Sequence, residues 1–90
     1  MSQKIQTDLA IAQTVLAFIR SRYSAAQQRS LAADDLLLEG GIIDSMGFID
    51  LIAFIESEFE IVVEGEDMVP EHFQTVNSIA HLIEIKQASR

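Results

Sequence analysis

Helical periodicity is the feature of this sequence that most restricts its fold. Apolar residues recur at intervals of three and four positions in three long segments. The spacing predicts helices over about 4–23, 45–59 and 76–87, and a short helical turn is expected at 70–73. The longest alternating stretch, "EIVVE", is too short to build a sheet. We therefore predict an all-α fold, a small four-helix bundle with a long loop between the first two helices and a short third helix.

The buried face of each predicted helix follows from the same spacing. We expect inward side chains at Ile5, Leu9, Ala12, Leu16, Ile19 and Tyr23, widened by Ile11, Val15 and Phe18, in the first helix; at Phe48, Leu51, Ile52, Ile55 and Phe59 in the second; and at Val76, Ile79, Ala80 and Ile83 in the last. The other side of the second helix carries Met46, Ile49, Asp50, Ala53 and Ser57, flanked by Glu56, and Phe54 lies on the border. Exposed apolar groups mixed with acids are typical of a docking surface.

A long connection, residues 24–43, joins the first two helices. Its apolar residues can pack beneath it: Leu31, Leu36, Leu37, Leu38, Ile42 and Ile43. Gly40 and Gly41 predict a turn, since glycine adopts backbone dihedrals that other residues avoid. Long loops in compact domains are often functional. After this loop, Asp44 or Ser45 is expected to cap the second helix, as Thr75 does the last, with Pro70 at the first position of the short turn.

Length and charge narrow the range of functions. Ninety residues suit a single domain spanning residues 1–90. The net charge is −8, and no Lys or Arg occurs from Ser30 to Ile85, a span that holds thirteen of the fourteen acidic residues. Such a surface repels nucleic acids and anionic membranes and attracts basic protein surfaces. We therefore expect protein partners, and neither nucleic-acid nor membrane binding.

Cysteine is absent, which excludes disulfides, thiolate metal sites and cysteine nucleophiles, and fits a reducing compartment. The N-terminal segment does not resemble a signal peptide, because Lys4, Asp8 and several glutamines interrupt its apolar residues. No apolar run approaches the ~20 residues that cross a bilayer. These features predict a cytoplasmic protein, which we expect to be a monomer.

The sequence holds no complete catalytic motif. Its "IDSMG" lacks the G-x-S-x-G pattern of a hydrolase, and the spacing of His72 and His81 suggests no triad, with His81 expected at the surface. An EF-hand pattern fails after Asp35, where Leu37 occupies a ligand position. The acids of "EGED" are expected to form a solvated face, and no glycine-rich phosphate loop with its lysine is present. We therefore predict no catalytic residue and no metal site.

Ser45 stands where the glycine-containing loop meets the second helix, and its position allows two interpretations. It could simply cap the helix. Alternatively, the free backbone N–H groups and the positive end of the helix dipole would stabilise a phosphate attached to its hydroxyl. A second enzyme would then supply the chemistry, so no base is needed near the serine. The acidic, partly apolar helix beside Ser45 would be the surface that this enzyme binds.

The segment "GGIIDSMGFIDLIAFIESEFEI" resembles the phosphopantetheine attachment motif of acyl and peptidyl carrier proteins. In that family an Asp-Ser-Leu core usually follows a glycine and two apolar residues and precedes an amphipathic helix. The segment "EDMVPEHFQTVNSIAHLI" resembles the family's short third helix and the Thr-Val that begins its fourth. The resemblance covers essentially the whole chain and implies the carrier-type bundle. Met46 replaces the usual leucine, and Gly47 is expected to loosen the helix start by ~1 kcal/mol; we interpret both as tuning of partner choice.

The resemblance also implies a role for the residues of this motif. Ser45 would carry 4′-phosphopantetheine through a phosphodiester, and Asp44 would be the motif aspartate. The prosthetic thiol would hold a cargo as a thioester, so the protein would be a non-catalytic carrier. The partner-facing positions would be Met46, Ile49, Asp50, Ala53 and Glu56. The implied partners are a phosphopantetheinyl transferase, an adenylating or acyl-loading enzyme, and downstream tailoring or condensing enzymes.

The type of carrier is indicated by finer similarities. The freestanding form, with "LLLEGGIIDSMGFIDLIAFIE" and "PEHF", resembles discrete carriers of secondary metabolism that accept aminoacyl groups from adenylating enzymes. D-alanyl carriers are another relative. Two alternatives stay open at this point. One is a fatty-acid or polyketide carrier, and the other is an unmodified helical module that binds proteins through Met46, Ile49 and Ala53.

Overall fold

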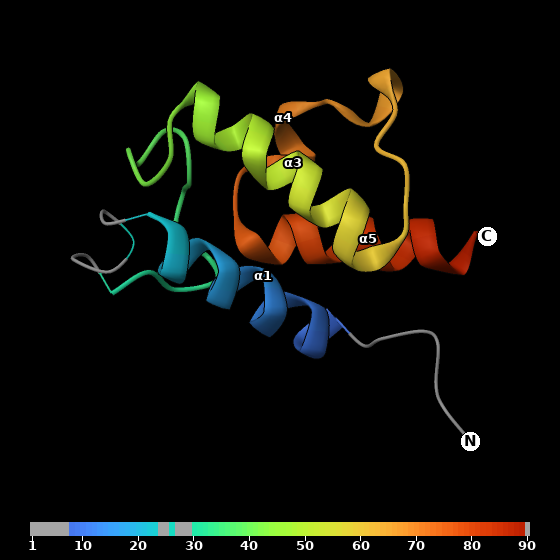
Figure 1. The fold of residues 1–90 in the computed structure, drawn as a ribbon, viewed down its shortest axis with the longest axis horizontal. Coiled ribbons are helices and arrows are strands. Elements are labelled where there is room, and N and C mark those ends of the chain that lie inside the picture. The colour runs from blue at the N-terminus through green and yellow to red at the C-terminus, as the bar shows by residue number, and fades with distance from the viewer. Residues whose placement is uncertain (1–7, 24–25, 27–29, 90) are drawn as a thin grey trace.

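The computed structural model describes residues 8–23, 26 and 30–89, and over these ranges it contains helices and loops but no strand (Figure 1). The elements are α1 (Asp8–Arg22), α3 (Ser45–Phe59), the 3₁₀ turn η1 (Gly65–Asp67), α4 (Pro70–Phe73) and α5 (Val76–Ala88). The four α-helices of the described part confirm the predicted all-α bundle with its short third helix. Residues 4–7 of the predicted first helix lie outside the described ranges, and its other end lies one residue earlier than predicted.

The helices are arranged around α5. Figure 1 shows α1 and α5 lying side by side, with α3 crossing above them and α4 next to the start of α5. Two hydrogen bonds connect the long loop before α3 to residues at the start of α5. Its Leu37 N–H donates to the Gln74 carbonyl at 2.9 Å, and the N–H of Asn77 donates to the Ala33 carbonyl at 3.0 Å. None of the described helices is long and apolar enough to cross a membrane.

Local side-chain contacts explain where the helices begin. The Asp44 carboxylate accepts the Gly47 N–H at 2.8 Å, which identifies Asp44 as the residue that caps α3. Thr75 caps α5 in the same way, by accepting the Ser78 N–H at 3.1 Å, as predicted. Pro70 occupies the first turn of α4, where its missing N–H is not needed. At its other end α3 stops at Glu60, whose left-handed backbone (φ 55°) cannot continue a right-handed helix.

The core corrects the predicted face of the first helix. Its fully buried positions in α1 are Ile11, Val15 and Ile19, with Ala12 beside them, whereas Leu9 is 68% exposed and Leu16 is half-buried. The predicted burial of Ala12 and Ile19, and of the widening residues Ile11 and Val15, is confirmed, whereas the prediction for Leu9 was wrong. The buried stripe is therefore centred closer to Ile11 and Val15 than predicted. The predicted position Ile5 lies outside the described residues.

The remaining core predictions are confirmed with two exceptions in the loop. Leu51, Ile55, Phe59, Val76, Ile79, Ala80, Ile83, Leu31, Leu37, Ile42 and Ile43 are all buried, and Phe48 and Ile52 are half-buried. Leu36 and Leu38 are each 43% exposed, so the expectation that they pack under the loop was wrong. Of the three consecutive leucines, Leu37 is the one that is fully buried.

Phe54, which the sequence left on the border of α3, stacks on Phe18 of α1. The two ring centroids are 3.9 Å apart and the ring planes are nearly parallel, at 9°. Phe48 makes the other aromatic contact that positions α3, meeting the Phe73 ring edge-on at 5.1 Å. One aromatic pair therefore joins α3 to α1, and the other joins it to α4.

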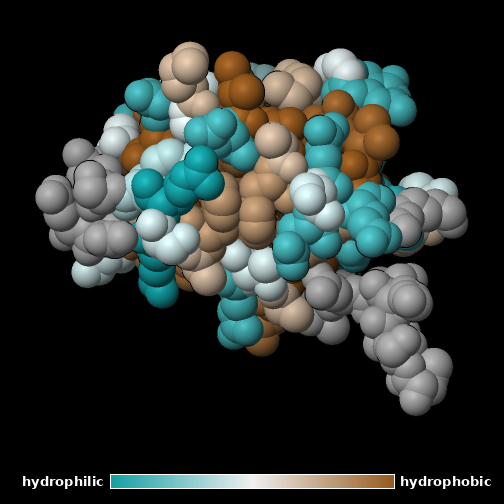
Figure 2. All heavy atoms as spheres, in the orientation of Figure 1, coloured by the Kyte–Doolittle hydropathy of each residue, from teal (hydrophilic) through white to brown (hydrophobic). Residues whose placement is uncertain are grey.

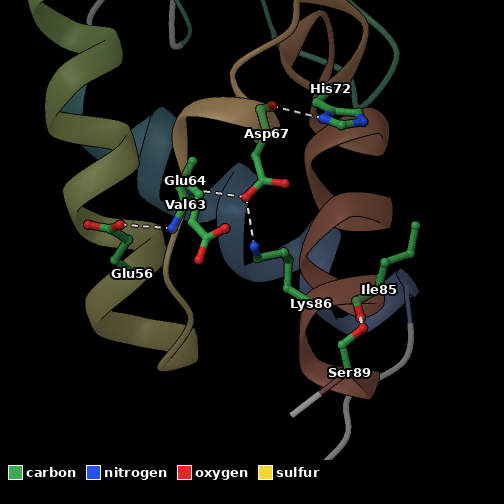
Figure 3. A network of polar contacts seen from close by, with 8 residues as sticks. All are labelled: Glu56, Val63, Glu64, Asp67, His72, Ile85, Lys86 and Ser89. Carbon is green, nitrogen blue, oxygen red and sulfur yellow. Dashed lines mark hydrogen bonds and ion pairs between the residues drawn. The ribbon is translucent and has the colours of Figure 1, made fainter.

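Polar contacts fix the connection between α3 and α4 (Figure 3). The Asp67 carboxylate accepts from Lys86 Nζ at 2.6 Å and from the Glu64 N–H at 2.9 Å, and the Asp67 carbonyl accepts from His72 Nδ1 at 2.8 Å. The Glu56 carboxylate accepts the Val63 N–H at 2.9 Å. The predicted solvated face of "EGED" is thus only partly right, since Asp67 pairs with a cation on α5.

Candidate functional site

Ser45 is the first residue of α3, and its side chain is exposed. Because Asp44 provides the cap, the interpretation of Ser45 as the capping residue was wrong. Its hydroxyl makes no hydrogen bond to any residue in the described part of the chain. The structure therefore leaves this oxygen accessible to a second molecule.

The backbone around Ser45 suits a negatively charged group. The N–H of Gly47 donates to Asp44, and the N–H of Phe48 begins the helical pattern by donating to the Asp44 carbonyl at 2.9 Å. Within the described ranges, the N–H groups of Ser45 and Met46 have no protein acceptor. The unpaired donors and the helix dipole favour a bound anionic group at this end of α3, and the charge of Asp44 opposes them.

The turn before Ser45 is held rigidly by backbone contacts. The N–H groups of Ile42 and Ile43 both donate to the Leu37 carbonyl, at 2.9 and 3.2 Å. Gly41 has a positive φ of 76°, which confirms the prediction of an unusual turn. Gly40 is required for a different reason, because a Cβ there would lie 2.3 Å from the Leu36 carbonyl oxygen. Buried isoleucines and this turn therefore hold the backbone that enters α3.

The outer face of α3 carries most of the predicted partner-facing residues. Met46 is 73% exposed and Ile49 62% exposed, and Asp50 and Ala53 are also exposed. Figure 2 shows apolar side chains interspersed with hydrophilic ones on the side of the molecule where α3 lies. These four residues form a continuous strip that starts one residue after Ser45, and we call it the α3 strip.

Glu56, the fifth predicted position, differs from the α3 strip. Its side chain is half-buried and accepts the Val63 N–H, so it points towards the loop that follows α3. The helical projection placed Glu56 beside the strip but could not show which way its carboxylate turns. Its observed contact is a structural one.

Two side chains that contact the start of α3 were missed by sequence reasoning. Arg22 Nη2 lies 3.6 Å from Asp50 Oδ2, and the Tyr23 hydroxyl donates to the Gly47 carbonyl at 2.8 Å. Both come from the end of α1, more than twenty residues before the residues they contact. The spacing within α3 carries no signal for either contact. The one available sign of a close neighbour was Gly47, which was instead interpreted as a residue that destabilises the start of the helix.

The remaining titratable candidates lie outside this arrangement. His72 donates from Nδ1 to the Asp67 carbonyl, and His81 is exposed on α5, as predicted. The residues that the structure describes contain no cluster of three His, Cys, Asp or Glu side chains that could hold a metal ion. Burial, and secondarily the negative charge of Asp50, raise the pKa of Tyr23 above its ordinary value. Its hydroxyl is therefore protonated at neutral pH and acts as a donor.

Comparison with known proteins identifies two informative relatives, while no protein-family model matches the chain. The chain is 33% identical to the D-alanyl carrier protein of Streptococcus suis (strain 98HAH33) over 69 residues, which span 77% of this chain and 85% of that relative. It is 28% identical to aminoacyl carrier protein 2 of Bradyrhizobium diazoefficiens over 81 residues, which span 86% of each chain. In the first match, the identity and the coverage of both chains are high enough to show that the two proteins belong to one family.

Proposed function

This chain belongs to the family of aminoacyl and acyl carrier proteins, and from this premise we propose that Ser45 is the attachment point of 4′-phosphopantetheine. The observation that carries the proposal is the state of the Ser45 hydroxyl, which is exposed at the first position of α3 and has no hydrogen bond to the described residues. A serine that served only as a cap would have its oxygen occupied by a backbone N–H. Here Asp44 performs that task, and Ser45 is left available for modification.

The residues around Ser45 fit a phosphodiester. The N–H groups of Ser45 and Met46 have no acceptor within the described ranges, and anionic groups are favoured at the N-terminus of a helix. When attached, the prosthetic group would supply a flexible arm that ends in a thiol, on which cargo is held as a thioester. The chain itself contains no cysteine, so this thiol would be the only one that the carrier presents. The protein's own part is then to bind partner enzymes and expose the serine.

The α3 strip is the surface that we expect partner enzymes to bind. It combines exposed apolar side chains, Met46 and Ile49, with the acid Asp50, directly beside the modified serine. Apolar contacts supply affinity, and the acid steers basic surfaces towards it. The partners are a phosphopantetheinyl transferase, a loading enzyme, and the tailoring or condensing enzymes that consume the cargo. This role is non-catalytic.

An aminoacyl group is the cargo favoured here over a fatty-acid or polyketide chain. The support comes from the two relatives, one named as a D-alanyl carrier and the other as an aminoacyl carrier. We place the carrier in a specialised biosynthetic pathway, where an adenylating enzyme would load it. Incubating the modified protein with adenylating enzymes, individual amino acids and ATP, followed by intact mass measurement, tests this assignment. Loading only from acyl-coenzyme A donors would instead favour the fatty-acid or polyketide alternative.

The attachment itself is tested by incubating the protein with a broad-specificity phosphopantetheinyl transferase and coenzyme A. Wild type should gain the mass of one phosphopantetheine group, and Ser45→Ala should gain nothing while remaining folded. Ser57→Ala is the matched control, because it removes an exposed serine hydroxyl from the same helix and should be modified like wild type. A folded wild-type protein that gains no mass would leave the unmodified helical binding module as the better description.

A further inference from the structure

One side chain connects the end of α1 to the first turn of α3. The Tyr23 hydroxyl donates a hydrogen bond of 2.8 Å to the Gly47 carbonyl. The Gly47 N–H donates to the Asp44 carboxylate, also at 2.8 Å. Both polar groups of the glycine that lies two residues after Ser45 are therefore held by side chains, one from the cap Asp44 and one from Tyr23, which follows α1.

Gly47 is matched to the tyrosine ring that lies against it. A Cβ at this position would lie 2.8 Å from Cε1 and 3.3 Å from Cζ of Tyr23, and 3.3 Å from the Asp44 carboxylate. Contacts below 3.0 Å require something to move, so only glycine lets the ring approach this closely. The interpretation of Gly47 as a residue that merely loosens the helix is thereby corrected. Its missing side chain makes room for Tyr23.

The tyrosine is itself fixed from behind. Phe18 meets the Tyr23 ring edge-on, with centroids 6.4 Å apart, and Phe18 in turn stacks on Phe54 in the middle of α3. The Tyr23 N–H also donates to the Ile19 carbonyl at 3.0 Å, which continues the hydrogen-bond pattern of α1. The hydroxyl thus reaches Gly47 from a well-packed side chain and not from a freely rotating one.

We propose that Tyr23 is a positioning residue, which holds the first turn of α3 so that the Ser45 hydroxyl is presented in one orientation to the transferase. The proposal rests on the modification of Ser45 proposed above. A glycine in the first turn favours fraying, because it has more conformations to lose than any other residue. The bonds from Tyr23 and Asp44 oppose that fraying where the reacting oxygen is attached. Docking through the α3 strip would not depend on Tyr23, whereas the alignment of the serine after docking would.

The test is the steady-state kinetics of phosphopantetheine transfer to Tyr23→Phe, which keeps the ring and removes only the hydroxyl. We expect kcat to fall roughly three- to tenfold, the factor that corresponds to one lost hydrogen bond, while KM for the carrier stays unchanged. Amide hydrogen exchange at Ser45–Gly47 should accelerate by a similar factor. Gly47→Ala, which pushes the ring away, should lower kcat in the same way.

Two controls separate positioning from general stability. Thr14→Val removes a hydroxyl-to-carbonyl bond of the same kind, from Thr14 to Ala10 at 3.1 Å, which lies within α1 and does not join it to α3. Ile83→Val lowers stability from the core of α5. Both should retain wild-type kcat. An unchanged kcat for Tyr23→Phe, a change confined to KM, or an equal loss in either control would overturn the proposal. If wild type itself is never modified, the proposal that Ser45 carries phosphopantetheine fails. Hydrogen exchange tests the role of Tyr23 separately: an unchanged exchange rate at Ser45–Gly47 in Tyr23→Phe would show that Tyr23 does not position this turn.

Discussion

Lys86 Nζ in α5 lies 2.6 Å from Asp67 Oδ2, and this pair ties the connection between α3 and α4 to the last helix (Figure 3). Neither side chain is fully exposed, with 21% of Lys86 and 13% of Asp67 accessible. The Glu64 N–H donates to the same carboxylate oxygen. These contacts, and to a lesser extent the charge of His72, hold the pKa of the Asp67 carboxyl below its ordinary value. Asp67 therefore connects the segment between α3 and α4 to His72 in α4 and to Lys86 in α5.

Replacing Asp67 with asparagine should lower the stability of the protein at neutral pH. A carboxyl whose pKa is lowered by folding contributes stability above its unfolded pKa, about 3.9, and loses that contribution as the pH falls through the folded pKa. The difference in urea midpoint between wild type and Asp67→Asn should thus be present at pH 7 and become smaller at a pH well below the unfolded pKa of about 3.9. Glu71→Gln, which neutralises an exposed acid on α4, should leave the midpoint unchanged at both values. A difference that does not shrink in acid would contradict the prediction.

Isoleucines on opposite faces of α3 should behave in opposite ways. Ile55 is 1% exposed and Ile49 is 62% exposed. Ile55→Ala removes buried methyl groups and leaves a cavity, so it should cost about 2–5 kcal/mol of unfolding free energy. Ile49→Ala should change stability by less than about 0.5 kcal/mol, yet lower kcat/KM for the transferase. Chemical denaturation and transfer kinetics on both variants check the pair, and a large stability loss in Ile49→Ala would show that the α3 strip is not free.

Much of this fold could be predicted because helix periods and end signals are local. The bounds of α3 and α4, and the caps of α3 and α5, follow from residues within a few positions of each helix end. The direction of a helix face is less local. Leu9 was expected at the centre of the stripe in α1 and Ile11 only at its edge, yet Ile11 is fully buried and Leu9 is 68% exposed. Periodicity determines the spacing of a buried face, whereas neighbouring helices determine its centre.

The same distinction between local signals and contacts across the fold applies to the candidate site. Ser45 and the exposed residues of the α3 strip were found from a contiguous segment, because an exposed position on one helix needs no distant partner. The orientation of the Glu56 carboxylate could not be predicted, since its hydrogen bond to Val63 depends on how the following loop turns back. Tyr23 was assigned to the inward stripe of the first helix by its spacing alone. Its bond to Gly47 joins segments that only the folded bundle brings together.

The glycines before and after α3 should tolerate substitution very differently. Gly40→Ala would place a Cβ against the Leu36 carbonyl, and backbone that is anchored on Leu37 cannot easily move away. We expect a loss of about 1–3 kcal/mol, as for other overpacked positions. Gly65→Ala is the matched control, because a Cβ there would meet nothing within 4 Å, and it should change stability by less than about 0.5 kcal/mol. Thermal or urea denaturation of the two variants tests these expectations. An equal loss of stability in both variants would contradict them.

Reversing the charge of Asp50 should slow partner binding without unfolding the protein. Asp50 is exposed in the α3 strip, and its pair with Arg22 spans 3.6 Å between side chains that are both more than half accessible, so its loss should cost at most about 1 kcal/mol. At low ionic strength, Asp50→Lys should lower kcat/KM for the transferase roughly three- to tenfold, because it removes an attraction for basic surfaces and adds a repulsion. The difference should shrink towards 1 M salt, where the screening length falls to about 3 Å.

Glu58→Lys provides the control for Asp50→Lys, since it makes the same charge change on the same helix but outside the α3 strip. It should reduce kcat/KM clearly less at every salt concentration, because the partner is expected to dock beside Ser45 and not at the far end of α3. Equal losses in the two variants would mean that net charge, and not the position of Asp50, governs binding. A loss in Asp50→Lys that does not depend on salt would point instead to a direct packing contact. Measuring both variants at several salt concentrations with one transferase separates these outcomes.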